Sequence, residues 1–182
     1  MDFAGLLKES WEKLIAEIVP LVLFTLVGWL LCFTIILIPT VVGGWVRGFL
    51  AYTRDGTPPA FEELWSFDDY LPIGLMILLG MIGITIGYML LFVPGVILSV
   101  WWLYSMYFLL DRDMGVIEAF AASKEAVSAD GFLNHLGILL LLTLLSMLAG
   151  ALSGIGGLFT TPFGFLLVSL AYLDITNAPN ES

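Results

Sequence analysis

The run of residues 71–110 contains forty residues and no Asp, Glu, Lys, Arg or His. Two other apolar runs are similar: residues 18–53 carry Arg47 as their only charge, and residues 132–173 carry His135 as their only acidic or basic side chain. Continuous helices of this length would extend about 54 to 63 Å. The hydrocarbon core of a membrane is about 30 Å thick. Each run therefore predicts a chain that folds back on itself in a membrane.

The composition points to the same class of protein. Hydrophobic residues make up 60% of the chain and charged residues 12%, whereas soluble domains average about 45–50% apolar and about 25% charged residues. A chain of 182 residues has little mass left outside the membrane and no room for a separate soluble catalytic domain. We therefore predict one all-α integral membrane domain over residues 1–182.

Proline and glycine interrupt each long run once. Proline has no backbone N–H and disrupts a helix interior, but it fits the first turn of a helix. We therefore expect three helical hairpins that turn at Pro39, at Pro94 and Gly95, and at Pro162, where Thr161 would cap the returning helix. The six predicted transmembrane helices cover residues 18–38, 39–54, 71–92, 94–111, 135–153 and 161–174. A kink within one tilted helix, or re-entrant half-helices that turn back inside the membrane, are the alternatives.

The segments between the hairpins mix apolar and charged residues. The N-terminal stretch "FAGLLKESWEKLIAEI" and residues 116–128 each place apolar side chains along one helical stripe, which is typical of helices lying in the membrane interface. The predicted order is an interfacial helix at 1–17, hairpin 18–54, acidic loop 55–70, hairpin 71–111, interfacial segment 112–134, hairpin 135–174 and tail 175–182.

The basic residues predict an orientation. With the N-terminus inside, six crossings place Lys8, Lys13, Arg54, Arg112 and Lys124 on the cytoplasmic side, in agreement with the positive-inside rule. If segment 39–54 did not cross the membrane, Arg54 would lie on the opposite side of the membrane from Lys8 and Lys13. We therefore expect a multi-pass protein of the plasma membrane with both termini in the cytoplasm.

The overall charge excludes some functions. Sixteen acidic and six basic residues give a formal net charge of −10, which argues against nucleic-acid binding and against a polybasic headgroup patch. The single cysteine, Cys32, lies in an apolar run and has no intrachain partner for a disulfide.

Arg47 and Arg54 are the candidate lipid or anion contacts. Charges within apolar runs are costly and often functional. Arg47 lies seven residues before Arg54, about two helical turns, so its long side chain could extend to the headgroups and bind a phosphate. A packed ion pair and a substrate site are the alternatives for Arg47.

Glycines recur at a spacing of four residues. Small residues at this spacing allow close helix approach in lipid, within the chain or between copies in a homo-oligomer. The predicted helix-packing positions are Gly44, Gly48, Gly83, Gly87, Gly150 and Gly154.

Few residues suggest catalysis or metal binding. His135 has no second His, Cys or nearby carboxylate at ligand spacing. Arg112 in the sequence "DRD" would repel a cation. No nucleophile with an activating base is recognisable. We therefore predict no cofactor, no metal and no enzymatic activity. The competing hypothesis of a lipid-modifying enzyme requires His135, Asp111 and Asp113 to meet in one cleft.

The stretch "FVPGVILSVWWLYSMYFLLDRDMGVIEAFAASKEAV", followed by "FLNHLGILLLL", resembles a set of prokaryotic multi-pass membrane proteins. The set includes the membrane domain attached to some glycerophosphoryl diester phosphodiesterases. The shared pattern is Pro94-Gly95, an aromatic-rich helix, Glu118-Ala119-Phe120 and Ser123. The upstream "GGWVRGFLAYTRDGTPPAFEELWSFDDYLPIGL" is similar to a largely archaeal branch. The resemblance implies a six-helix membrane domain without an established activity. The resemblance implies no catalytic role for this chain, because in those phosphodiesterases the chemistry belongs to a separate catalytic barrel domain.

The combined interpretation is a non-catalytic membrane scaffold or accessory subunit that binds membrane lipids or a protein partner. Residues 61–70 and 116–128 are the expected partner surfaces. The alternative is a small transporter or channel in which Arg47 lies near an anion site.

Overall fold

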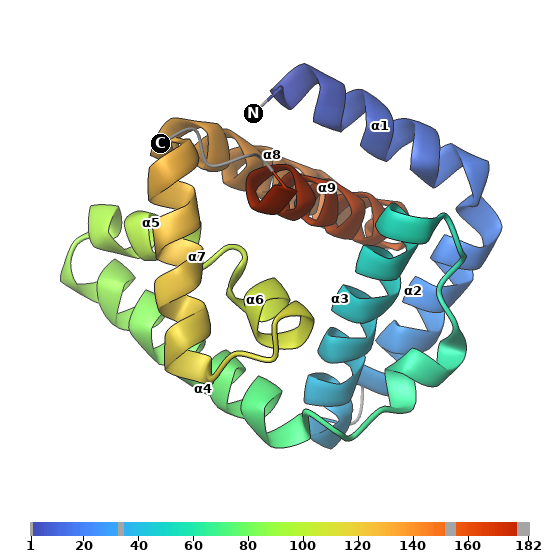
Figure 1. Cartoon of the computed structure of the whole chain (residues 1–182), viewed down its shortest axis with the longest axis horizontal. Coiled ribbons are helices and arrows are strands. Elements are labelled where there is room, and N and C mark those ends of the chain that lie inside the picture. Colours follow the sequence, from blue (N-terminus) through green and yellow to red (C-terminus); the bar gives the residue numbers. More distant parts are fainter. Residues whose placement is uncertain (1, 33–34, 152–155, 178–182) are drawn as a thin grey trace.

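The computed structural model describes residues 2–32, 35–151 and 156–177, and this part of the chain is all-helical, without strands (Figure 1). Apart from two short 3₁₀ turns, η1 (Ile35–Leu37) and η2 (Phe61–Trp65), it forms nine α-helices. These are α1 (Phe3–Ala16), α2 (Ile18–Cys32), α3 (Ile38–Asp55), α4 (Tyr70–Leu90), α5 (Phe92–Trp101), α6 (Ser105–Asp111), α7 (Val116–Asp130), α8 (Phe132–Ala151) and α9 (Gly157–Asn177).

The prolines lie close to helix starts, but only one position matches the prediction. Pro39 lies in the first turn of α3. The turn before α5 is at Leu91, whose backbone is extended (φ −163°, ψ 134°), so Pro94 and Gly95 lie inside α5. Pro162 lies inside α9, which begins five residues earlier. The first four N–H groups of a helix have no intrahelical partner, so Pro94 interrupts no hydrogen bond.

The predicted third turn is also wrong in its detail. Thr161 lies within α9 and does not cap it. The residues directly before α9, 152–155, lie outside the described part of the chain. The apolar run thus turns back earlier than the proline suggested.

The predicted helix 94–111 is interrupted between α5 and α6. The side chain of Ser123, on α7, is fully buried beside this break. Its Oγ accepts a hydrogen bond from Tyr104 N (3.1 Å) and donates one to Trp101 O (2.7 Å). One hydroxyl therefore satisfies two backbone groups that the break would otherwise leave unpaired.

Among the described residues, four helical segments are long and apolar enough to cross a membrane: Tyr70–Leu90, Phe92–Asp111, Phe132–Ala151 and Gly157–Asn177. A fifth is counted if α1 and α2, which meet at 89°, form one bent span. Large apolar side chains point outward on α4, where Leu71 is 78% and Met89 82% exposed. Such a continuous apolar surface needs lipid or a partner to cover it. Several helices are thus suited to a membrane, but six crossings are not confirmed.

The α2–α3 pair differs from the other hairpins. α2 has 15 residues and is about 22 Å long, which is short of the roughly 30 Å core. α3 carries both Arg47 and Arg54. The hydroxyl of Tyr70, at the start of α4, donates a hydrogen bond to the carbonyl of Ile36 (2.9 Å). Ile36, two residues before α3, therefore lies beside the start of the next span.

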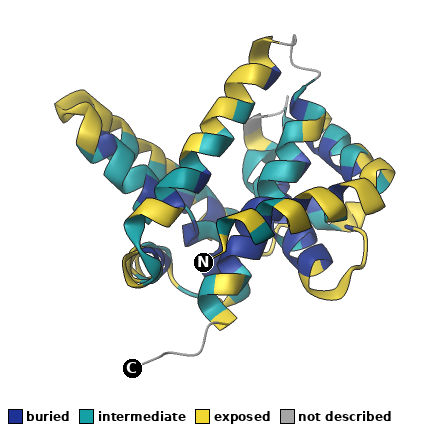
Figure 2. Ribbon diagram, turned by 90° about the horizontal axis from the view of Figure 1, so that it is seen from above, coloured by how far each residue is buried: buried dark blue, intermediate teal, exposed yellow. Residues whose placement is uncertain are grey.

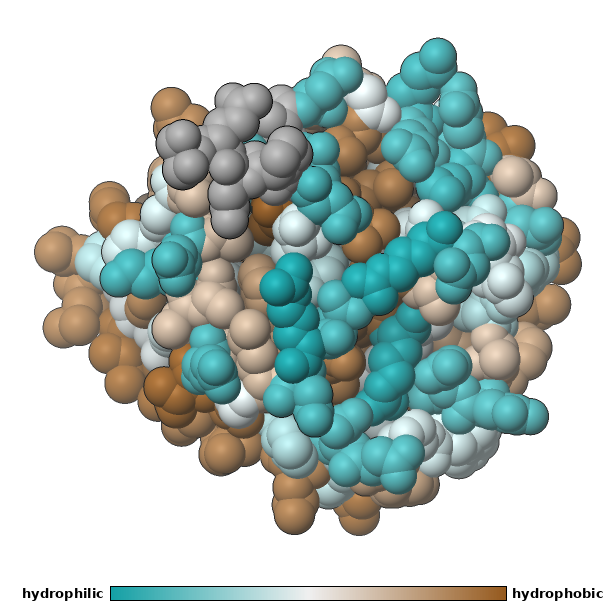
Figure 3. Space-filling view, viewed as in Figure 1, coloured by the Kyte–Doolittle hydropathy of each residue, from teal (hydrophilic) through white to brown (hydrophobic). Residues whose placement is uncertain are grey.

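The buried residues collect where the helices meet, and exposed residues dominate the splayed helix ends (Figure 2). One apolar core surrounds Tyr104, Tyr107 and Tyr172, and a second surrounds Phe24 and Phe49. Hydrophilic side chains gather across one face of the molecule, with apolar side chains prominent around its rim (Figure 3). This distribution suits a protein with one broad aqueous surface and lipid around its sides.

Candidate functional site

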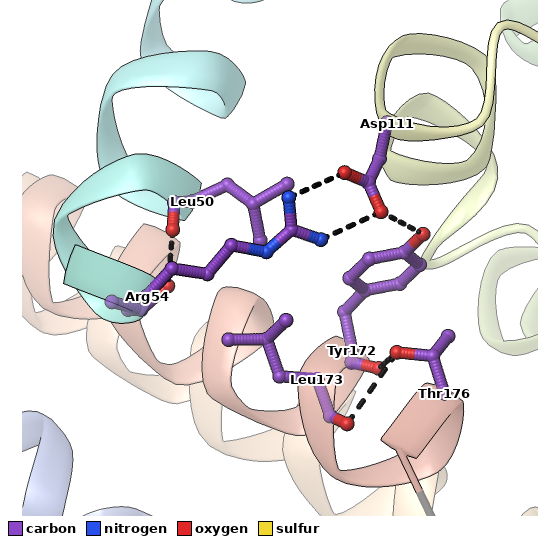
Figure 4. Close-up of polar contacts among 7 residues, drawn as sticks. Leu50, Arg54, Asp111, Tyr172, Leu173 and Thr176 are labelled. Carbon is purple, nitrogen blue, oxygen red and sulfur yellow. Dashed lines mark hydrogen bonds and ion pairs between the residues drawn. The ribbon is translucent and has the colours of Figure 1, made fainter.

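Arg54, on α3, forms a bidentate ion pair with Asp111 at the end of α6. Its Nη1 and Nη2 donate hydrogen bonds to Oδ1 and Oδ2 of Asp111, at 2.6 and 2.7 Å. The hydroxyl of Tyr172 donates to the same Oδ2 at 2.8 Å, as Figure 4 shows. Bidentate, charge-assisted bonds of this kind are both strong and directional. The cluster therefore ties α3, α6 and α9 together at one level.

The ring of Tyr172 fixes the geometry of this cluster. Tyr172 is fully buried, and its ring packs against those of Tyr107 (centroids 5.3 Å apart) and Phe108 (5.1 Å). The Asp111 carboxylate is 14% exposed and the Arg54 side chain 41% exposed. The carboxylate is thus oriented from the protein interior, while the guanidinium reaches toward the surface.

Arg47 is paired with a carboxylate at the start of another span. Its Nη2 donates a hydrogen bond to Oδ2 of Asp69, the residue directly before α4. The Nη1 atom of Arg47 is buried and has no hydrogen-bond partner among the described residues. A buried guanidinium nitrogen without an acceptor is costly. Nη1 is therefore a donor of Arg47 that the described residues leave without an acceptor.

Two pockets lie along α3 and both include Val46. The smaller one, of about 180 Å³, is here called the polar pocket. It lies between α3 and α6 and is lined by Val46, Arg47, Leu50, Ala51, Arg54, Asp55, Leu110 and Asp111.

The larger pocket, of about 340 Å³, is here called the apolar pocket. Its walls come from α3, the α5–α6 segment, α8 and α9. Its lining is Val42, Val46, Leu103, Met106, Tyr107, Leu142, Leu145, Ser146, Thr160, Thr161, Gly164, Phe165 and Val168.

A third contact brings the N-terminal helix to the same region. Lys13 Nζ donates a hydrogen bond to Thr53 O (3.3 Å), and the Tyr52 hydroxyl donates to Lys13 O (2.9 Å). These bonds join the end of α1 to the end of α3. Lys13 and Arg54 therefore lie on the same side of the molecule.

Gly83 and Gly87, on α4, lie where helices approach closely. A Cβ atom at Gly83 would lie 2.6 Å from the ring of Trp102. A Cβ atom at Gly87 would lie 2.9 Å from the Cα of Gly95. Real Cβ atoms do not tolerate such distances, so larger residues here would push α4 and α5 apart.

The other predicted packing glycines behave differently from one another. A Cβ atom at Gly44 would overlap the backbone of η2, and one at Gly48 would lie 2.9 Å from Phe24. No atom of the described residues lies within 4 Å of a Cβ atom built at Gly150, so no close contact among them explains this glycine. Gly154 lies outside the described residues.

His135 lies in a separate buried cluster. Its Nδ1 is 2.8 Å from the Tyr104 hydroxyl, and its Nε2 is 3.2 Å from a carboxylate oxygen of Asp130. Asp111 instead contacts Arg54 and Tyr172. The described contacts therefore give His135 and Asp111 different partners. No group of three His, Cys, Asp or Glu side chains suited to a metal ion occurs in residues 2–32, 35–151 and 156–177.

Sequence reasoning selected the two arginines but missed their partners. Asp69 lies 22 positions from Arg47, and Asp111 lies 57 positions from Arg54. Tyr172, which bonds to Asp111, is a further 61 positions along the chain. No local spacing connects these residues. Ser123 belonged to the motif that carried the family resemblance, but its role in the α5–α6 break was not foreseen.

No protein-family model, no curated protein and no solved structure matches the chain. The resemblance to the membrane domain of phosphodiesterases therefore stays a prediction. Any assignment of function depends on the contacts described above.

Proposed function

We propose that this chain is a non-catalytic scaffold or accessory subunit of the plasma membrane that binds lipid at its cytoplasmic surface. One observation carries the proposal: both arginines of α3 pair with carboxylates at the ends of candidate spans, Arg47 with Asp69 and Arg54 with Asp111. The ends of spans lie at headgroup level. Arg47 and Arg54 are therefore suited to the membrane surface, where phosphate groups are abundant.

The contacts favour four full crossings, made by α4, α5 with α6, α8 and α9. In this arrangement α2 and α3 turn back without crossing. Six crossings would place Ile36 and Tyr70 at opposite membrane surfaces, about 30 Å apart, whereas a 2.9 Å hydrogen bond joins them. The six-crossing arrangement of three hairpins stays the alternative.

The four-crossing arrangement also agrees with the basic residues. The bonds from Lys13 to Thr53 and from Arg54 to Asp111 bring these cations to one side. The positive-inside rule assigns that side to the cytoplasm. We therefore propose that both termini are cytoplasmic.

Exposed aromatic residues among acidic ones support a role in protein contacts. Phe61, Trp65 and Phe67 are 45%, 51% and 55% exposed, and acidic residues lie between and after them. On α7, Ile117 is 70% exposed. These residues support a partner surface at 61–70 and 116–128.

A small transporter or channel is the second candidate, and the polar pocket favours it because Arg47 and Arg54 both line this pocket. The ion pairs with Asp69 and Asp111 argue against an arginine that is free to bind and release a passing anion. A wet path that continued from the polar pocket through the membrane would favour transport.

Purification of the full chain in native-lipid particles tests the proposal. Mass spectrometry should find the same lipids or the same membrane protein in repeated preparations, and liposomes containing the pure protein should show no anion flux. Flux that rises with protein density and is lost in Arg47→Gln would contradict the scaffold and favour the transporter.

A further inference from the structure

We propose that the polar and apolar pockets together hold one phospholipid, with its phosphate at Arg47 and one acyl chain in the apolar pocket. This inference rests on the proposed lipid-binding function and names the ligand and its orientation. It comes from the adjacency of an apolar pocket to a pocket that Arg47 and Arg54 both line. The Nη1 atom of Arg47 is buried and has no hydrogen-bond partner among the described residues.

The two pockets follow one another along the same helical row. Val42, Val46 and Leu50 are spaced by four residues on α3 and therefore lie on one face. Val42 lines the apolar pocket, Leu50 lines the polar pocket, and Val46 lines both. A ligand that is apolar at one end and polar at the other fits this order.

The pockets also follow one another in depth. On the α5–α6 segment, Leu103 and Tyr107 line the apolar pocket, whereas Leu110 and Asp111, at the end of the span, line the polar pocket. The apolar pocket therefore lies deeper in the proposed membrane. A phospholipid has the same polarity, with its chains toward the membrane interior and its phosphate at the surface.

The apolar pocket suits an acyl chain in size and chemistry. Its volume of about 340 Å³ lies within the usual range of about 300–1,000 Å³ for small-molecule sites. Two of its hydroxyls already have acceptors on the protein: Ser146 donates to Leu142 O (2.8 Å), and Tyr107 donates to Phe165 O (3.4 Å). The hydroxyls of Ser146 and Tyr107 therefore need no hydrogen-bond acceptor from a ligand.

The polar pocket suits a phosphate. Its volume of about 180 Å³ equals roughly six waters at about 30 Å³ each. Phosphate oxygens accept strong hydrogen bonds from guanidinium groups, and Arg47 has Nη1 without a partner in the described chain. Two arginines and two aspartates, Asp55 and Asp111, line this pocket, so their charges cancel. We therefore expect a zwitterionic phospholipid to bind at least as well as an anionic one.

Native mass spectrometry of the full chain in detergent tests the assignment. The probes are phosphatidylethanolamine, phosphatidylglycerol and diacylglycerol with identical acyl chains. One bound phosphatidylethanolamine is expected, with at least about tenfold weaker binding of diacylglycerol, because it lacks the phosphate. Equal binding of diacylglycerol, or binding that needs the net charge of phosphatidylglycerol, would overturn the proposal.

Matched variants separate the ligand contact from the fold. Arg47→Gln and Asp69→Asn break the same ion pair, but only Arg47→Gln removes the guanidinium. We expect Arg47→Gln to weaken phosphatidylethanolamine binding about tenfold and Asp69→Asn to leave it unchanged or stronger. Equal losses in both variants would show that the ion pair acts through the fold and would overturn the role of Arg47.

Two substitutions on α8 test the acyl-chain site. Ser146→Phe fills the apolar pocket, whereas Leu148→Phe alters a 58% exposed side chain that does not line it. Only Ser146→Phe should reduce lipid binding, by at least about fivefold. If both variants or neither variant lost lipid binding, the pocket would be rejected as the lipid site. The scaffold proposal would stand if the same lipids or partners were still found in native-lipid particles. Anion flux would reject the scaffold itself.

Discussion

Removal of the Tyr172 hydroxyl tests whether the Arg54–Asp111 cluster stabilises the fold. The ring is fully buried against Tyr107 and Phe108, so Tyr172→Phe keeps its packing and leaves no large cavity. The change removes one 2.8 Å hydrogen bond to a carboxylate, and hydrogen bonds to charged groups contribute about 1.5–3 kcal/mol. The carboxylate is only 14% exposed, so water replaces the bond poorly. We expect the free energy of unfolding to fall by about 2 kcal/mol.

The assay is reversible unfolding by SDS in mixed micelles, followed by far-ultraviolet circular dichroism. Tyr88→Phe is the control, because this tyrosine is 41% exposed and its hydroxyl makes a long, 3.4 Å contact with Ser99. The substitution keeps the ring, so its effect should stay within about 0.5 kcal/mol. In an Asp111→Asn background, Tyr172→Phe should cost at least about 0.5 kcal/mol less, since the charge is gone. The reasoning is refuted if Tyr172→Phe costs no more than Tyr88→Phe, or costs the same in both backgrounds.

Two further predictions concern packing and the break between α5 and α6. Gly87→Ala should destabilise the protein by roughly 1–3 kcal/mol, because the new methyl group meets the backbone of Gly95. Gly150→Ala is the control: no described residue lies within 4 Å of the new methyl group, so the change should be neutral or stabilising by up to about 1 kcal/mol. Equal losses of stability in the same unfolding assay would contradict the contact between Gly87 and Gly95. Ser123→Ala should cost about 1–3 kcal/mol, because Tyr104 N loses its acceptor and Trp101 O loses its donor. Ser123→Thr keeps a hydroxyl and should recover part of the loss in the same unfolding assay; no recovery would contradict the role of the hydroxyl.

Much of the helical organisation was predictable because lipid thickness limits how long an apolar helix can be. The predicted segments 18–38, 39–54, 71–92, 135–153 and 161–174 correspond mainly to α2, α3, α4, α8 and α9. The prolines were less informative for exact turns, since Pro94 fits within the first turn of a helix that had already begun at Phe92. The break between α5 and α6 was not predictable, because its backbone groups are satisfied by a side chain 19 or more residues away.

The number of crossings was the weakest prediction. Run length alone treats residues 18–53 like the other two runs, although this run contains Arg47 and ends beside Arg54. The hydrogen bond from Tyr70 to Ile36 could not be read from local spacing. Of the candidate site, the sequence predicted only the two arginines, Arg47 and Arg54. Their partners, Asp69 and Asp111, depend on how α3 packs against α4 and α6.

Cysteine labelling from each side of the membrane tests the central claim most directly. In a Cys32→Ala background, single cysteines replace Ile36, Thr57 and Leu91, all of which are exposed, and a membrane-impermeant maleimide is applied to right-side-out and inside-out vesicles. Four crossings predict that Leu91→Cys reacts only from outside, that Thr57→Cys reacts only from inside, and that Ile36→Cys does not react from outside. Reaction of Ile36→Cys from outside together with Leu91→Cys would contradict the four-crossing arrangement and restore the six-crossing one.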